Sequence, residues 1–167
     1  MDSLSPIVLF TYLRLETLEK TIHALAANSY ASESDLIIYS DGAKFAKDIE
    51  RVNKIRAFLK TIRGFKSLTI HESPTNKGLA TSIIQGVSSV LTRYPSAIVL
   101  EDDLLTSTNF LAFMNASLGR FKEVKDVYSI SGYSFDFPQV SSNIDGYFLN
   151  RSWSWGWATW SDRWNEI

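Results

Sequence analysis

Four short apolar runs, each followed by a segment of helical periodicity, restrict this chain to a small set of folds. The runs are IVLFT (7–11), LIIYS (36–40), SLTIH (67–71) and AIVLE (97–101). Near-continuous apolar runs of this length are typical of strands that are buried on both faces, and their alternation with helices predicts a mostly parallel sheet. We therefore expect an α/β fold with helices on both faces of the sheet.

The intervening segments predict helices over residues 15–28, 48–63 and 108–121, and a further helix after the loop ESPTNKG. The alternation of strand and helix segments stops after Gly132, so a mixture of parallel and antiparallel elements is expected there. VYSIS (127–131) predicts a fifth strand and GYFLN (146–150) a sixth. The second helix should turn its apolar residues inward: Ile49, Val52, Ile55, Leu59 and Ile62.

Length and charge favour one domain over 1–167, because 167 residues suit a single core and the net charge of −1 offers no nucleic-acid footprint. The chain has no cysteine, so thiolate metal sites and disulfides are excluded. The N-terminal apolar run is too short for a signal peptide or an integral membrane segment. We expect a cytoplasmic protein, with peripheral membrane association as an alternative.

Three consecutive carboxylates, Glu101, Asp102 and Asp103, follow the fourth apolar run. Adjacent negative charges repel one another, so the cluster either lies in a solvated turn or faces a cation. If the strand order is 3-2-1-4, the segments after the first, second and fourth strands meet where such sheets bind ligands. The cluster would then lie near Thr11 to Arg14 and near Asp41.

The chain lacks the residues that several common binding sites of α/β proteins require. FTYLRLETLE contains no glycine, which excludes a dinucleotide-binding turn, and no P-loop is present. The first strand carries no acid of the kind that dehalogenase-type phosphatases and receiver domains need. A Gly-rich, Arg-containing loop of sugar nucleotidyltransferases is also missing.

Four stretches together resemble glycosyltransferases of the GT-A fold. IVLFTYLRLETLEKTIHAL and TNKGLATSIIQGV are similar to segments of family 2 transferases, and RSWSWGWATWSDRW resembles the Trp/Gly segment of bacterial sugar transferases. VLEDDLLTSTNFLAFM resembles the Glu-Asp-Asp segment of the N-acetylglucosaminyltransferase I group. The resemblance implies a Rossmann-like, nucleotide-diphospho-sugar transferase fold with a DXD-type motif.

The activity that this resemblance implies is transfer of a sugar from a nucleotide-sugar donor to an acceptor hydroxyl. A UDP-sugar and inversion are favoured, and the acceptor is a glycan, a lipid-linked sugar or a protein. The implied metal is Mn²⁺ or Mg²⁺, held by Asp103, with Glu101 as a supporting acid. The implied donor-binding residues are Thr11, Arg14, Asp41 for the base, Lys77 near the diphosphate, and Asp102 for the ribose or sugar.

The tryptophans of the last segment have two expected roles. Trp160 and Trp164 should pack in the core, whereas Trp153 or Trp155 could stack on a sugar. The catalytic base of inverting relatives follows this segment, so we expect the base and much of the acceptor site beyond Ile167. An aromatic segment left uncovered would favour self-association.

Two alternatives remain open. The chain could be a binding module, a decayed or partial transferase that retains nucleotide affinity without turnover. It could also be a metal-dependent phosphotransferase or phosphatase, which the absence of an acid on the first strand argues against.

Overall fold

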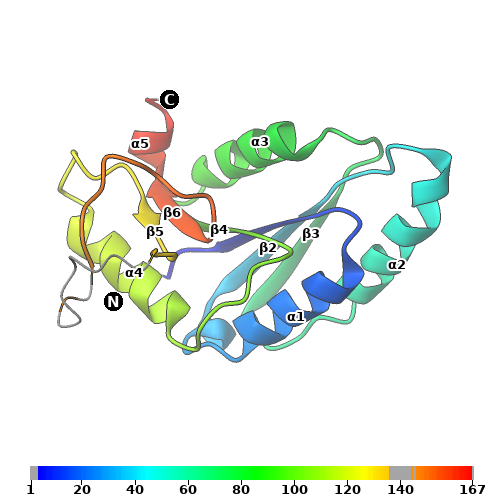
Figure 1. Cartoon of the computed structure of the whole chain (residues 1–167), viewed down its shortest axis with the longest axis horizontal. Coiled ribbons are helices and arrows are strands. Elements are labelled where there is room, and N and C mark those ends of the chain that lie inside the picture. Colours follow the sequence, from blue (N-terminus) through cyan, green and yellow to red (C-terminus); the bar gives the residue numbers. More distant parts are fainter. Residues whose placement is uncertain (1–3, 136–143, 145, 167) are drawn as a thin grey trace.

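The computed structural model describes residues 4–135, 144 and 146–166, which form one six-stranded sheet covered by helices (Figure 1). The sheet order is β3-β2-β1-β4-β6-β5. The strands are β1 (Ile7–Thr11), β2 (Asp35–Ser40), β3 (Ser67–Glu72), β4 (Ser96–Glu101), β5 (Ile130–Ser131) and β6 (Trp157–Trp160). Strands β1 to β4 are parallel, and β6 pairs antiparallel with both β4 and β5. The predicted order 3-2-1-4 is confirmed.

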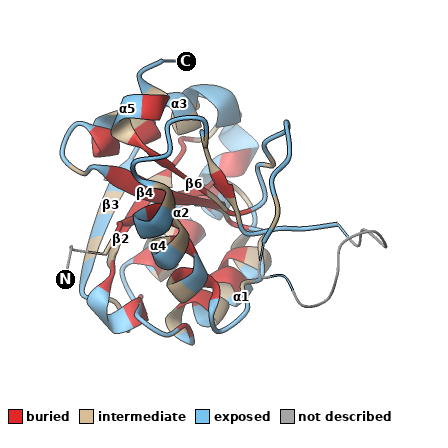
Figure 2. Ribbon diagram, turned by 90° about the vertical axis from the view of Figure 1, so that its left-hand side faces the viewer, coloured by how far each residue is buried: buried red, intermediate tan, exposed pale blue. Residues whose placement is uncertain are grey.

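Alternate residues of the central strands supply two apolar cores. Ile7 and Leu9 of β1 lie in the core that α1 (Leu15–Ala26), α2 (Ile49–Leu59) and α4 (Phe110–Phe121) cover. Val8 and Phe10 lie in the opposite core, under α3 (Leu79–Leu91) and the short α5 (Ser161–Trp164). The central strands β1, β2 and β4 are therefore buried on both faces, whereas the edge strand β3 is mostly exposed (Figure 2). This explains why the three central strands read as continuous apolar runs.

The helices agree with the sequence prediction except at their ends. Helix α2 stops at Leu59, so the segment up to residue 63 is not helical. Ile49 was expected to face inward but is 52% exposed, because the first turn of α2 projects beyond the sheet edge, whereas Val52, Ile55 and Leu59 are buried. Two short 3₁₀ helices, Ala31–Glu33 and Ala46–Asp48, were not predicted.

The prediction of a sixth strand at residues 146–150 is wrong. The described residues at 146–150 form no strand, and β6 consists of Trp157–Trp160 instead. Gly156, directly before this strand, has φ +71°, a left-handed conformation that a glycine adopts readily. The predicted fifth strand is shortened to Ile130–Ser131. Antiparallel β6 confirms the expectation of mixed elements after residue 132.

A buried arginine explains how the Trp-rich segment is held. The Arg163 side chain lies over the Trp160 ring at 4.3 Å and donates to the carbonyls of Phe121, Lys122 and Val124 at the end of α4. Trp160 is 4% exposed, and Trp164 packs on the α3 side and donates to Ser88 Oγ at 2.8 Å. Both tryptophans are packing residues, as predicted.

No helix among the described residues is long and apolar enough to span a membrane.

Candidate functional site

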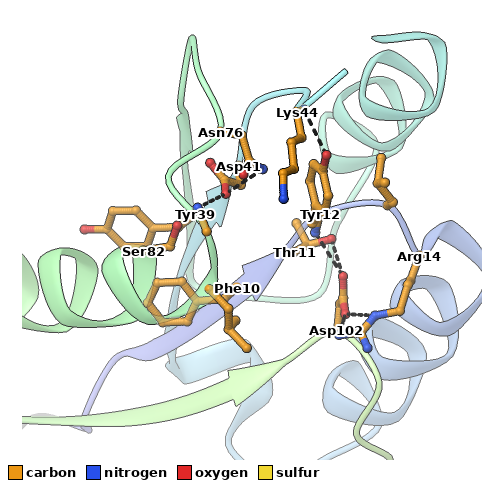
Figure 3. Close-up of a pocket in the computed structure, with 13 residues that line it drawn as sticks. Phe10, Thr11, Tyr12, Arg14, Tyr39, Asp41, Lys44, Asn76, Ser82 and Asp102 are labelled. Atoms are coloured by element: carbon orange, nitrogen blue, oxygen red, sulfur yellow. Dashed lines mark hydrogen bonds and ion pairs between the residues drawn. The ribbon is translucent and has the colours of Figure 1, made fainter. Parts of the chain in front are cut away.

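A pocket of about 400 Å³ opens at the carboxyl ends of β1 and β2, beside the start of α3 (Figure 3). We call it the β1–β2 pocket. It lies next to the boundary between β1 and β4, where the chain has crossed from one face of the sheet to the other. Its volume falls in the range of roughly 300–1,000 Å³ found for small-molecule sites. Its polar or charged lining residues are Thr11, Tyr12, Arg14, Tyr39, Asp41, Lys44, Asn76, Ser82 and Asp102.

Asp102, directly after β4, is almost fully buried at 1% exposure, and both of its oxygens are occupied. Oδ2 accepts the Thr11 hydroxyl at 2.7 Å and the Tyr12 backbone N–H at 3.1 Å. Oδ1 accepts Arg14 Nε at 2.8 Å and lies 2.6 Å from Arg14 Nη2. The parallel register of β1 with β4 brings these segments together. Asp102 thus joins the two strand ends.

Arg14 also reaches Asp103, whose Oδ2 accepts from Nη1 at 2.7 Å. One guanidinium therefore pairs with two neighbouring carboxylates and offsets part of their negative charge. Partial burial lowers the pKa of Arg14, but the charges of Asp102 and Asp103 and the hydrogen bonds to Asp102 outweigh this and raise the pKa above its ordinary value. Arg14 and Asp103 side chains are 49% and 40% exposed, so this contact faces solvent.

Glu101, the last residue of β4, is half-buried. Burial and the charge of Asp103 raise the pKa of its carboxyl, and Arg14 offsets this only in part. The three consecutive acids therefore have different environments: a partly desolvated Glu101, a saturated Asp102 and a solvent-facing Asp103.

Asp41 directly follows β2 and organises the loop before α3. It is 8% exposed and accepts the backbone N–H groups of Gly42, Lys77 and Gly78 at 2.9 to 3.1 Å. Asn76 Nδ2 adds a further hydrogen bond at 3.0 Å. The carboxylate predicted to contact a nucleotide base is thus used to fix the loop that forms one wall of the pocket.

Two lysines lie near the pocket. Lys77 was predicted as a site residue, but the lysine that lines the pocket is Lys44, which was not predicted. Lys77 directs its ammonium group to Gln85 Oε1 at 2.9 Å and lines a neighbouring hollow of about 340 Å³ rather than the β1–β2 pocket. Lys44 extends into the β1–β2 pocket between Asp41 and Tyr12 (Figure 3). The sequence signal was available, since Lys44 follows the strand-end Asp41 by three residues in DGAK.

Tyr12 holds the loop that carries Lys44. Its hydroxyl accepts the Lys44 backbone N–H at 2.9 Å and donates to Asp48 Oδ2 at 3.1 Å. Burial raises the pKa of this phenol, and its hydrogen bond to Asp48 adds to the rise. The phenol is therefore a neutral donor at physiological pH.

Trp153 and Trp155 do not line the β1–β2 pocket. They belong to a separate aromatic cluster, in which Trp153 contacts Phe135 and Trp155 contacts Tyr133, each with ring centroids 4.7 Å apart. Trp155 is 49% exposed. Sugar stacking and self-association through this cluster stay predictions.

The acidic cluster as it is arranged does not fit a divalent metal. Among the residues that the structure describes, no group of three or more His, Cys, Asp or Glu side chains is placed to hold an ion. Asp102 has no free oxygen, and Arg14 lies on Asp103. The positive partner of these carboxylates is therefore an arginine of the chain itself.

No protein-family profile matches the sequence, and no curated protein is detectably similar to it. Solved structures do resemble its fold. The N-terminal part of TarS from S. aureus (residues 1–349) has a TM-score of 0.50 at 12% identity, covering 75% of this chain and 34% of that one. A mannosyltransferase from Pyrobaculum calidifontis, in complex with GDP-Man and Mn²⁺, has a TM-score of 0.46 at 15% identity, covering 68% and 31%.

A 4-diphosphocytidyl-2C-methyl-D-erythritol synthase from Anaerococcus prevotii has a TM-score of 0.49 at 12% identity, covering 95% of this chain and 71% of that one. This chain spans about a third of the length of the mannosyltransferase and of the TarS fragment. The mostly parallel six-stranded sheet with helices on both faces confirms the predicted α/β fold class, and the TarS fragment shares this fold.

Proposed function

We propose that this chain is the nucleotide-sugar-binding part of a GT-A-type glycosyltransferase. The observation that supports this most is the convergence of four segments on the β1–β2 pocket: the end of β1, the loop after β2, the loop before α3 and the acid after β4. Such a convergence beyond the carboxyl ends of parallel strands is where α/β sheets bind nucleotides.

The charges of the pocket suit a diphosphate ester. Asp41 and Asp102 both lie in the wall, but each carboxylate is covered by hydrogen bonds from the protein. Lys44 adds a cation at the pocket, whereas Arg14 is already paired with Asp102 and Asp103. Charge-assisted hydrogen bonds from such groups are the usual means of holding phosphate oxygens.

The reaction we propose is attack of an acceptor hydroxyl on the anomeric carbon of the sugar, with cleavage of the bond from that carbon to the diphosphate oxygen. The nucleoside diphosphate leaves with the electron pair, and Lys44 stabilises its negative charge. A UDP-sugar donor and inversion belong to this proposal, and the proton of the acceptor hydroxyl passes to a general base. The role of Asp103 in holding Mn²⁺ or Mg²⁺ stays a prediction, and no step is derived through a metal.

Calorimetric titration of UDP and GDP, in EDTA and in Mn²⁺, tests the proposal. Lys44→Ala should weaken binding by roughly tenfold or more, because a charge-assisted hydrogen bond is worth about 1.5–3 kcal/mol. Lys47→Ala is the matched control, since Lys47 lies close by in the 3₁₀ helix Ala46–Asp48 and outside the pocket lining. The Lys47→Ala variant should bind the nucleotide with the same affinity as the wild type.

Folded protein that binds neither nucleotide under either condition would refute the proposed function. Equal losses in the two lysine variants would show that the nucleotide binds elsewhere. Release of phosphate from a generic phosphoester, without preference for nucleoside diphosphates, would favour the phosphatase alternative.

A further inference from the structure

The segment between β2 and α2 carries an exposed aromatic ring among positive charges. Residues 44–47 (KFAK) are all exposed, and Phe45 is 55% exposed. Ile49, in the first turn of α2, is 52% exposed. We call residues 44–51 the basic segment. Figure 1 shows that the chain passes from β2 into α2 at the right-hand end of the molecule, so the basic segment forms part of that end.

The acids of the basic segment are buried or paired. Asp48 is 6% exposed, and its Oδ2 accepts the Tyr12 hydroxyl at 3.1 Å and the Phe45 backbone N–H at 3.2 Å. Glu50 Oε1 lies 2.8 Å from Lys54 Nζ. The exposed basic residues of the segment are Lys44, Lys47 and Arg51. The segment therefore presents positive charge to solvent, although the net charge of the chain is −1.

The Phe45 ring is held on the outside of the molecule. The backbone on either side of it is fixed, because the Phe45 N–H donates to Asp48 and the Lys44 N–H donates to the Tyr12 hydroxyl. Lys44 Nζ and Lys47 Nζ each lie 5.6 Å from the ring centroid, which is within the range of cation–π contacts. An apolar ring is thus flanked by two ammonium groups.

An anionic lipid surface fits this arrangement. Lipid phosphates attract exposed Lys and Arg side chains, and apolar side chains beside them enter the boundary between headgroups and acyl chains. Long basic side chains keep their charged ends among the headgroups while their stems lie against apolar groups. Phe45 and Ile49 line neither of the two hollows described above, so they form an exposed tip suited to insertion rather than a groove for a peptide.

We propose that the basic segment docks this protein on an anionic membrane surface. Phe45 and Ile49 insert among the lipids, and Lys47 and Arg51 contact the headgroup phosphates. Lys44 also lines the β1–β2 pocket, so docking holds the mouth of that pocket beside the membrane. The inference goes beyond the proposed function, because it concerns a surface of the chain and needs no nucleotide.

The experiment is sedimentation of the purified protein with phosphatidylcholine vesicles that contain or lack phosphatidylglycerol. We expect binding to the anionic vesicles alone, and weaker binding as salt is raised. Phe45→Ser and Lys47→Ala should each lower the partition coefficient by roughly fivefold or more, since the first removes inserted apolar surface and the second a charge at the headgroups. Thermal unfolding confirms that the variants are folded.

Two control variants change exposed residues outside the basic segment. Leu105→Ser alters a side chain that is 73% exposed, and Lys122→Ala removes an exposed lysine at the end of α4. Both should bind the anionic vesicles as the wild type does.

Folded wild-type protein that does not sediment with anionic vesicles would overturn the proposal, and the basic segment would then suit a protein partner. Equal binding to vesicles without phosphatidylglycerol would also overturn it, and so would equal losses in the control variants. Because no nucleotide is present, failure of the protein to bind UDP would refute the proposed function without affecting this result.

Discussion

Adjacent carboxylates Asp102 and Asp103 should differ sharply in their contribution to stability. Asp102→Ala removes the acceptor for the buried Thr11 hydroxyl and for the Tyr12 N–H. Asp103→Ala removes one solvent-facing contact to Arg14. The pair is a matched test, since the two residues have the same side chain and are neighbours in the sequence.

The expected magnitudes follow from these contacts. A buried donor without a partner costs roughly 1–3 kcal/mol, so two such donors would cost roughly 2–6 kcal/mol. Relief of repulsion among the three acids offsets part of this, and half-exposed Arg14 can turn to water, so we expect about 3 kcal/mol for Asp102→Ala. Asp103→Ala should cost less than about 1 kcal/mol.

Urea and thermal unfolding of both variants measure the difference. For a chain of this size about 3 kcal/mol corresponds to a fall in Tm of roughly 6–12 °C, and the Asp103 variant should change by no more than about 4 °C. Similar losses in the two variants would refute the reasoning, because they would mean that Asp102 does not hold the ends of β1 and β4 together.

Three further predictions concern other parts of the molecule. Gly42→Ala should destabilise the fold by about 1–3 kcal/mol in urea unfolding, since its Cβ would lie 2.5 Å from backbone of the facing loop, whereas Gly119→Ala in α4 meets nothing within 4 Å and should be neutral or stabilising. Arg163→Met should cost roughly 2–4 kcal/mol in the same assay, because it leaves carbonyls at the end of α4 without donors. A hydrogen bond from Lys125 lowers the pKa of Asp162 to about 2. The stability that this carboxylate adds is present above its unfolded pKa of about 4 and is lost as pH falls toward 2. Asp162→Asn should therefore be less stable than the wild type at pH 7, with the gap closing between pH 4 and pH 2; a constant gap would contradict the assignment.

The parallel part of the sheet could be predicted because its physical signal is local. Strands buried on both faces need continuous apolar runs, and the runs at 7–11, 36–40 and 97–101 each coincide with a strand to within one residue. The run at 67–71 lies in β3, an edge strand whose residues are mostly exposed. The order 3-2-1-4 then followed from common α/β topology. The sixth strand was misplaced to 146–150, because β6 is held by pairing with β4 and β5, which are distant in sequence.

Part of the candidate site could be predicted, because the order of the parallel strands determines which strand ends lie close together. Thr11, Arg14, Asp41 and Asp102 lie at or just after strand ends, and strand ends of a parallel sheet meet at one edge, so their meeting at one pocket follows from topology. Lys77 also belongs to a loop at this edge, but its side chain lies on Gln85. Side-chain direction depends on the packed neighbours, which the loop sequence does not specify.

The sequence by itself determined the α/β architecture, the edge of the sheet at which polar residues gather, and the presence of three adjacent acids that need a compensating charge. Only the tertiary structure decided what compensates them. Arg14 lies 88 residues from Asp102 along the chain, and the β1–β4 register alone brings its guanidinium onto both carboxylates. The sequence shows that the three acids are adjacent, but which cation pairs with them depends on how the fold brings distant segments together.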